Sequence, residues 1–390
     1  MKYDFDTTIQ RFGTDSIKWD VKEGELPMWV ADMDFKTAPQ IIEAIRKRAE
    51  HGVFGYMSDR PEWYEAYMNW WSSRHSFEMK KEWLLFSTGV IPIISSTVHK
   101  LATPGEKIVI QTPVYNVFTN CIVNNGCTVA ENRLVYQNGT YSIDWDDLEA
   151  KLADPQVSLM ILCNPHNPIG KIWDSKTLER IGEMCAANGV VVISDEIHCD
   201  VTAPGCGYVP FASVSPVCRD NCIMCIAPTK AFNIAGLKSA AACIPNKDLR
   251  HKVWRAINTD EVAEPNSFAI VAAVAAFNES GDWLDEMCEY VEGNRRHVAE
   301  FISSELPSLS LVPGNATYLL WIDISSLGMP SKKVAEHIRS TTGLFVTAGR
   351  YYGENGDGFL RMNVACPRTT LEDGLERLKR GVESLQDKVN

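Results

Sequence analysis

The stretch Val190-Val191-Val192-Ile193-Ser194-Asp195-Glu196-Ile197-His198 decides the fold, together with the later stretch Cys222-Ile223-Met224-Cys225-Ile226-Ala227-Pro228-Thr229-Lys230. In each stretch a short apolar run predicts a buried strand, and a charged side chain follows the run. These side chains are Asp195 and Lys230. Open α/β sheets bind their ligands beyond the carboxyl ends of the strands. We therefore expect the carboxylate and the amine to face one site.

Similar apolar runs recur along the chain and alternate with helical patterns. They lie at residues 107–111, 128–130, 159–163 and 240–244. The clearest helical pattern covers residues 174–188, with Asp174 as its expected N-cap and Gly189 past its end. Strands that are apolar throughout and alternate with helices indicate a mainly parallel sheet with helices on both faces. The sequence thus predicts an α/β fold.

The pattern changes near Gly281. We expect a long helix at residues 283–306, strands at 318–324 and 358–364, and further helices from Ser331 and at residues 369–386. This order indicates a smaller α+β domain, which the N-terminal segment is expected to join. The expected division is residues 46–282 for the large domain, and residues 1–45 with residues 283–390 for the small domain.

Two helices are expected ahead of the sheet. The first begins at Thr37 as N-cap, has Pro39 in its first turn and ends before Gly52. The second covers residues 61–75 and carries an aromatic stripe. Such a stripe is more typical of a core or a subunit interface than of a cofactor site. Its members are Trp63, Tyr64, Tyr67, Trp70 and Trp71.

Composition and charge restrict the class of protein. Of 390 residues, 45% are apolar and 23% are charged, which is typical of a globular protein of about two domains. The net charge of −12 argues against nucleic acid or an anionic membrane as a partner. No run approaches the roughly 18 apolar residues of a membrane span, and the first residues lack the apolar part of a secretory signal. We expect a cytoplasmic protein.

The twelve cysteines are scattered along the chain. In a reducing compartment they are expected to behave as small buried hydrophobic residues. The tightest group is Cys218, Cys222 and Cys225, with Cys206 upstream. No second C-x-x-C motif completes four ligands, so no metal site is predicted.

The pair formed by Asp195 and Lys230 carries the chemical prediction. Asp195 alone could merely cap the element that follows its strand. A buried lysine, however, is costly unless it is paired or used covalently, and burial lowers its pKa toward that of a useful base. Pyridoxal 5′-phosphate (PLP) needs such a pair, because a lysine binds its aldehyde as a Schiff base and a carboxylate keeps its pyridine nitrogen protonated.

Three further segments could complete this site. Asn167 lies in Cys163-Asn164-Pro165-His166-Asn167-Pro168-Ile169-Gly170 and can donate an amide hydrogen bond, although the segment is also a plain turn signal. Tyr115 follows a strand and could stack on a planar ring or simply pack. In Thr88-Gly89-Val90 a strand, a glycine and a helix start in succession favour anion binding. Neither G-x-G-x-x-G nor a Walker lysine motif is present.

Taken in order, these motifs resemble one enzyme superfamily over essentially the whole chain. Thr88-Gly89-Val90, Tyr115, NPHNPIG (164–170), SDEIH (194–198) and PTKAFNIAGLK (228–238) are similar to fold-type I PLP enzymes, the aspartate aminotransferase superfamily. LPMWVADMDF (26–35), FGY (54–56), DEIH (195–198) and FLRMNVACPR (359–368) more narrowly resemble its MalY/PatB branch of cystathionine β-lyase-like C–S lyases. This implies the α/β fold of PLP-dependent transferases of fold type I, whose large domain contains a mainly parallel sheet of seven strands covered by helices.

The resemblance implies a role for each matching residue. Lys230 would bind the cofactor and remove the substrate's Cα proton. Asp195 would pair with the pyridine nitrogen, Asn167 with the ring's 3′ oxygen, and Tyr115 would stack on the ring. His198 stands where aminotransferases usually place a tyrosine that bonds this oxygen, and Ala227 stands where the family often has a serine. The implied phosphate contacts are Gly89, Val90, Thr229, Lys238 and, from the partner subunit, Tyr56.

Substrate contacts follow in the same way. Arg361 would clamp the α-carboxylate, a task that suits its planar fork. Ala31 and Tyr115 would line the same space. Arg350 could be a solvated charge or could meet an acidic distal group of the substrate.

The implied reaction is α,β-elimination from L-cystathionine or another S-substituted cysteine, which yields a thiol, pyruvate and ammonia. An aminotransferase of aromatic or other apolar amino acids uses the same residues and remains an alternative. A regulatory protein that keeps PLP as a structural group is a third interpretation. The resemblance also implies a homodimer whose active sites are completed across the interface, with a small amino acid as the other partner.

Overall fold

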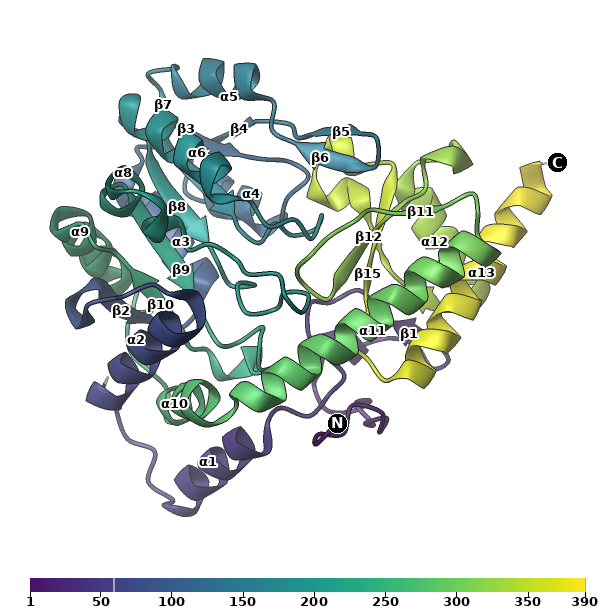
Figure 1. The fold of residues 1–390 in the computed structure, drawn as a ribbon, viewed down its shortest axis with the longest axis horizontal. Helices are drawn as coiled ribbons and strands as arrows, with labels where there is room; N and C mark the ends of the chain where they lie inside the picture. The colour runs from purple at the N-terminus through teal and green to yellow at the C-terminus, as the bar shows by residue number, and fades with distance from the viewer. Residues whose placement is uncertain (59, 390) are drawn as a thin grey trace.

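The strand that ends at Asp195 lies in the middle of a seven-stranded sheet. The computed structural model describes residues 1–58 and 60–389, and the sheet has the order β2-β10-β9-β8-β7-β3-β4 (Figure 1). All neighbouring strands are parallel except around β10, which is antiparallel to β2 and to β9. The predicted mainly parallel α/β sheet is therefore confirmed. Its strands are β2 (Leu84–Ser87), β3 (Lys107–Ile110), β4 (Thr128–Glu131), β7 (Val157–Cys163), β8 (Val191–Asp195), β9 (Cys222–Ile226) and β10 (Ala240–Cys243).

Helices cover both faces of this sheet because alternate residues of each strand point to opposite sides. Ile193 packs in the layer beneath α3, α4 and α9, whereas Val192 packs with α2, α5, α6 and α10. The bounds are α2 (Pro61–His75), α3 (Val90–Leu101), α4 (Val117–Val123), α5 (Trp145–Leu152), α6 (Ser175–Ala187), α9 (Lys247–Thr259) and α10 (Ala269–Glu279). Two short helices, α7 (Phe211–Val214) and α8 (Pro216–Asp220), and the hairpin of β5 (Val135–Gln137) and β6 (Thr140–Ser142) complete this part.

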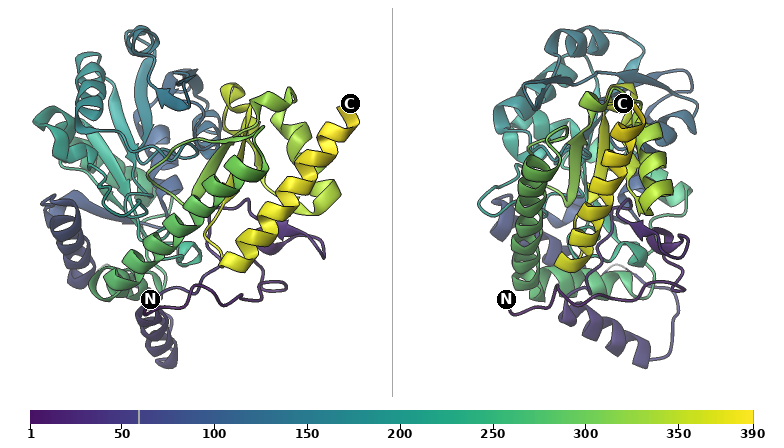
Figure 2. Two further views of the ribbon diagram at one scale, coloured as in Figure 1. Left: turned by 45° about the vertical axis from the view of Figure 1, so that its right-hand side comes forward. Right: turned by 90° about the vertical axis from the view of Figure 1, so that its right-hand side faces the viewer.

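A second sheet has four antiparallel strands in the order β11-β12-β15-β14. These are β11 (Ser310–Leu311), β12 (Leu319–Asp323), β14 (Thr347–Ala348) and β15 (Phe359–Asn363). The long helix α11 (Gly281–Glu305) runs beside α13 (Arg368–Val389), and α12 (Ser331–Thr342) packs on α13 (Figure 2). The N-terminal segment reaches this part, because β1 (Leu26–Pro27) pairs in parallel with β13 (Leu344–Phe345). The domain limits at residues 46 and 282 stay a prediction.

The aromatic helix α2 belongs to the core. Trp63, Tyr67, Trp70 and Trp71 are all buried, which agrees with the first of the two interpretations of its stripe. No described helix combines the length and the apolar character that a membrane span needs.

The expected cap of the first helix is wrong. Helix α1 (Pro39–Glu50) has Ala38 at its N-cap, with no side-chain capping bond. Thr37 instead donates its Oγ1 hydrogen bond to the carbonyl of Phe232 at 2.6 Å, so a tertiary contact replaces the local one. The predicted cap of α6 is confirmed, because Asp174 Oδ1 accepts from the Thr177 N–H at 2.8 Å.

A buried ion cluster, which the sequence did not predict, anchors the N-terminal segment. The Lys18 side chain is 1% exposed, and its Nζ lies 2.7 Å from Asp34 Oδ2. Arg11 Nη1 lies 2.7 Å from Asp34 Oδ1, to which Trp19 Nε1 also donates at 2.9 Å. Since charges out of water need close partners, this cluster fixes the path of the segment that follows.

We expect Lys18→Met to lower the free energy of unfolding by about 3 kcal/mol, because it leaves the buried Asp34 carboxylate with Arg11 as its remaining cation. Urea unfolding followed by circular dichroism measures this loss. Lys332→Met is the matched control: Lys332 is 64% exposed and lies 4.0 Å from Glu336, so its loss is expected to stay within about 0.5 kcal/mol. Equal stability of the two variants would contradict the role of the cluster.

Candidate active site

The carboxyl ends of the central strands frame the site. Asp195 is the last residue of β8 and lies between Cys163 of β7 and Cys225 of β9. Lys230 follows β9 in the chain, and both side chains line one cavity of about 560 Å³. The structure therefore brings together the acid and the amine from separate strands. Of the other residues singled out in the sequence, the same cavity is lined by Ala31, Thr88, Gly89, Val90, Tyr115, Asn167, His198, Thr229 and Lys238.

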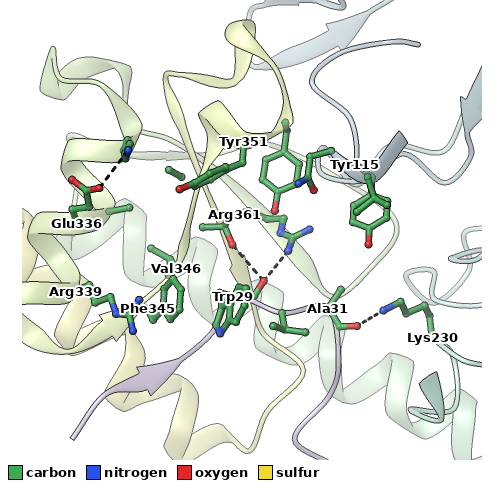
Figure 3. Close-up of a pocket in the computed structure, with 18 residues that line it drawn as sticks. Trp29, Ala31, Tyr115, Lys230, Glu336, Arg339, Phe345, Val346, Tyr351 and Arg361 are labelled. Atoms are coloured by element: carbon green, nitrogen blue, oxygen red, sulfur yellow. Dashed lines mark hydrogen bonds and ion pairs between the residues drawn. The ribbon is translucent and has the colours of Figure 1, made fainter. Parts of the chain in front are cut away.

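A second cavity has a volume of about 570 Å³ (Figure 3) and shares Ala31, Tyr115 and Lys230 with the first. Arg361 lies in this second cavity, as Figure 3 shows, between Tyr351 and Trp29. Its walls are mostly apolar and include Trp29, Phe345, Val346, Ala348, Tyr351 and Tyr352. At the far end Arg339 is already engaged, since its Nε and Nη2 each donate to Glu25 at 2.8 Å.

Lys230 is partly buried, and a backbone carbonyl holds its amine. Its Nζ donates to the carbonyl of Ala31 at 2.6 Å. Burial lowers the pKa of Lys230 to about 8, and the positive charges of Arg361 and Lys238 act in the same direction. The carboxylates of Asp32 and Asp195 act against this shift. Near neutral pH the amine therefore has a sizeable uncharged fraction and can act as a base.

Asp195 is an acid in need of a partner. Its side chain is buried and accepts one hydrogen bond among the described residues, from the Ile197 N–H at 3.1 Å. Burial raises the pKa of Asp195 to about 7. The neighbouring Glu196 points elsewhere, because its carboxylate is held by Ser194 and by the Phe211 N–H at 2.8 and 3.0 Å. Asp195 is thus the carboxylate that remains available to a ligand.

Arg361 connects two parts of the site. It comes from the middle of β15, and its Nη1 donates to Asn167 Oδ1 at 3.1 Å. Its Nη2 donates to the carbonyl of Trp29 at 2.7 Å. The Nε donor is buried and has no partner among the described residues. The guanidinium is therefore oriented by the protein and still has hydrogen-bonding capacity for an anion.

His198 is neutral in this environment. Burial lowers its pKa to about 3, and the charges of Lys230 and Arg361 add to the effect. Its Nδ1 has no hydrogen-bond partner among the described residues. A neutral imidazole with a free nitrogen offers one donor or acceptor to a polar atom of a bound group.

The opposite end of the first cavity is suited to an anion. Gly89 is the N-cap of α3 and Val90 its first residue, so the free N–H groups of this twelve-residue helix start at the cavity wall. Thr229 and Lys238 line the same space. A Cβ atom on Gly89 would lie 3.1 Å from Pro92 Cδ, which favours glycine at this turn.

Two of the singled-out residues lie outside both cavities. The Tyr56 side chain is 99% exposed and contributes to neither cavity of its own chain. Arg350 pairs with Glu354 at 3.1 Å on the surface, which agrees with the interpretation as a solvated charge. The sequence also missed Tyr318, whose OH donates to the Ala31 carbonyl at 3.1 Å; no local pattern signals a contact across so much of the chain.

A cluster of metal-ligand residues lies elsewhere, at His75, Cys199 and Asp200. The sequence did not single it out. His75 Nε2 is 2.8 Å from Asp200 Oδ1, and Arg74 Nε lies 3.7 Å from the same oxygen. This carboxylate already has Arg74 and His75 as partners, so the cluster is best described as a structural contact of Asp200.

Fold and site together define a PLP-dependent enzyme of fold type I. The family of aminotransferases of classes I and II matches residues 26–378, and the chain belongs to this family. It is 40% identical to cystathionine β-lyase PatB of Bacillus subtilis, over 96% of this chain and 98% of the relative. It is 32% identical to protein MalY of Escherichia coli, over 98% and 100%. A PLP-bound C–S lyase of Staphylococcus hominis superposes with a TM-score of 0.92 at 32% identity, over 98% of both chains.

The residues present fit this cofactor. The partly unsatisfied carboxylate of Asp195 suits a protonated ring nitrogen, because burial otherwise makes its charge costly. The start of α3 suits a phosphate, and the lowered pKa of Lys230 suits covalent attachment to an aldehyde. The orphaned Nδ1 of His198 adds a polar contact to the same cavity.

We expect the Lys230 amine of the cofactor-free protein to react with acetic anhydride with a midpoint near pH 8, whereas an ordinary lysine titrates near pH ~10.4. Peptide mass spectrometry across a pH series measures this midpoint. In Asp195→Asn the midpoint should fall further, because the Asp195 carboxylate stabilises the charged amine and the variant lacks it. A midpoint near that of an ordinary lysine would show that burial does not control this group.

Proposed function

We propose that the protein is a PLP-dependent carbon–sulfur lyase that cleaves L-cystathionine or other S-substituted cysteines by α,β-elimination. The similarity to PatB, to MalY and to the C–S lyase of Staphylococcus hominis supports this reaction. The observation that carries the proposal is the meeting of two cavities at Lys230, one with an acid and an anion site, the other with Arg361 and mostly apolar walls.

Each residue has a task in this reaction. Arg361 binds the substrate's α-carboxylate through its remaining donor capacity and so orients the Cα–H bond. Lys230 takes the α-proton at Nζ, because its lowered pKa leaves a sizeable neutral fraction near neutral pH. PLP, when bound, withdraws the electron pair left at the α-carbon, and Asp195 holds the proton on its ring nitrogen.

The leaving group is a thiolate, and the second cavity has room for its substituent. The C–S bond breaks with its electron pair on sulfur, and a thiolate leaves well because its conjugate acid has a pKa near ~8.5. Room beyond Arg361 accommodates the S-substituent, and Trp29 stacks on Phe345 there with ring centroids 4.8 Å apart. Water then completes the conversion of the remaining fragment to pyruvate and ammonia.

We expect the purified holoenzyme, given L-cystathionine and no keto acid, to release pyruvate and free thiol in equal amounts. Lys230→Ala should lower the rate by at least about 100-fold, because the base is lost. Coupled assays for pyruvate and thiol measure both products. Amino-group transfer that needs a keto acid, without thiol release, would instead establish an aminotransferase. Binding of PLP without turnover of either kind would favour the regulatory interpretation.

A homodimer with shared sites is part of the proposal, and the surface around Tyr56 supports it. Tyr56 is 99% exposed, and the nearby Val53 and Phe54 are 64% and 54% exposed. A group of exposed apolar side chains is typical of a surface that another chain covers. Tyr56 would then reach the phosphate site of the partner subunit.

Hybrid dimers test the sharing of Tyr56. We expect Tyr56→Ala and Lys230→Ala homodimers to be nearly inactive at limiting PLP. A hybrid of one Tyr56→Ala and one Lys230→Ala subunit should recover about half of the parental activity per dimer, since one of its two sites is then native. Co-production with two affinity tags isolates the hybrid. An inactive hybrid would mean that each chain supplies its own Tyr56.

Cytoplasmic location and the two-domain division also belong to the proposal. All twelve cysteines lie in the described part of the chain and are unpaired, which supports a reducing compartment.

A further inference from the structure

Five consecutive backbone carbonyls, from residue 29 to residue 33, accept hydrogen bonds from side chains, most of which lie about 200 residues or more away in the sequence. The donors are Arg361 and Thr347 to residue 29, Asn363 to residues 30 and 32, Lys230 and Tyr318 to residue 31, Lys18 to residue 32, and Arg11 and Asn233 to residue 33. A bent segment outside the sheets is thereby fixed carbonyl by carbonyl. The proposed base, Lys230, donates to the middle carbonyl, that of Ala31.

Asn363 holds two of these five carbonyls. It is two residues beyond Arg361 on β15, so both side chains lie on the same face of the strand. Its Nδ2 donates to the carbonyls of Val30 and Asp32, each at 2.6 Å. Its Oδ1 accepts from the Ala365 N–H at 2.8 Å. With an exposed fraction of 1%, this amide is fully committed to the backbone around it.

The two carbonyls held by Asn363 flank that of Ala31. Peptide groups are planar, so fixing the carbonyls of Val30 and Asp32 fixes the peptide planes on both sides of the Ala31 carbonyl. The Ala31 oxygen then points to Lys230 Nζ at 2.6 Å and also accepts from the Tyr318 OH at 3.1 Å. Tyr318 keeps this carbonyl bonded when Lys230 leaves it.

We propose that Asn363 is a positioning residue for Lys230, acting through the Ala31 carbonyl. The inference rests on the proposed role of Lys230 as the base. A base must lie within hydrogen-bond reach of the proton that it takes, and a displacement of about 1 Å can cost about 100-fold in rate. By fixing the Ala31 carbonyl, Asn363 fixes the position of Lys230 Nζ when the amine is hydrogen-bonded to that carbonyl.

Charged groups around Lys230 come from several elements, and each affects its titration. Asp32 lies on the segment that Asn363 holds, Arg361 on β15, Asp195 at the end of β8, and Lys238 beyond the loop of Lys230 itself. Releasing the segment weakens both the Ala31 contact and the contribution of Asp32. Both changes disfavour the charged amine, so they lower the pKa of Lys230 further.

Asn363→Leu tests the proposal because it keeps the size of the side chain and removes its hydrogen bonds. We expect kcat for L-cystathionine to fall about 10- to 100-fold with KM changed far less. In the cofactor-free protein, the acetylation midpoint of Lys230 should shift below its parental value near pH 8. The second measurement needs no turnover, so it also holds if the protein proves not to be a lyase.

Asn294→Leu is the matched control. Asn294 is fully buried, and its Nδ2 also bridges two carbonyls, those of Val364 and Cys366, at 2.8 and 2.9 Å. It holds none of the carbonyls of residues 29–33. We expect a similar loss of stability in urea but an unchanged Lys230 midpoint and kcat.

Equal effects of the two variants on kcat, or an unchanged Lys230 midpoint in Asn363→Leu, would overturn the proposal. If Asn363→Leu does not fold, Asn363→Ser provides the same comparison with a smaller, polar side chain. If the parent protein lacks lyase activity but Asn363→Leu still lowers the Lys230 midpoint, the proposed function is wrong and the positioning role stands.

Discussion

A partly buried lysine amine and a buried carboxylate that line one cavity are the constraint on which the rest of the site depends. Neither charge is stable away from water unless the protein or a ligand provides a partner. The sheet brings the two groups together, because the ends of β8 and β9 place Asp195 and Lys230 on one cavity. The N-terminal segment gives the amine a hydrogen-bond partner, the carbonyl of Ala31. The Asp195 carboxylate still lacks a charged partner, which a ligand can provide.

The two cavities suit different ligands. One contains the acid and the start of a helix, and so suits a charged, planar group with a phosphate. The other combines the oriented guanidinium of Arg361, which suits a carboxylate, with mostly apolar walls. Lys230 belongs to both. The same amine can therefore hold a cofactor in one cavity and act on a substrate in the other.

Much of this could be predicted from the sequence, because strand ends are local features. The apolar runs before Asp195 and Lys230 predict buried strands, and the topology of α/β sheets places their ends together. The turn at Gly89 and the loop with Asn167 follow from equally local signals. The phosphate-end residues and the ring contacts needed the resemblance to a family, because side chains such as Thr229 and Tyr115 have ordinary packing roles in most proteins.

The contacts that sequence reasoning missed are those between distant segments. Thr37 looks like a helix cap, but it bonds the carbonyl of Phe232 instead. Backbone carbonyls carry no sequence signature, so the bonds that Tyr318 and Asn363 make to the N-terminal segment could not be predicted. Tyr56 presents a different case, since its expected contact lies in another subunit and one chain alone leaves it exposed.

The pairing of β1 with β13, and of the following carbonyls with Arg361 and Asn363, also sets an order of assembly. A ribosome makes the chain from its N-terminus, so the segment that ends at Asp34 emerges first and its partners on β15 emerge almost last. The seven-stranded sheet can form while this segment still waits. The nascent protein therefore gains its active site only when nearly all of its residues have left the ribosome.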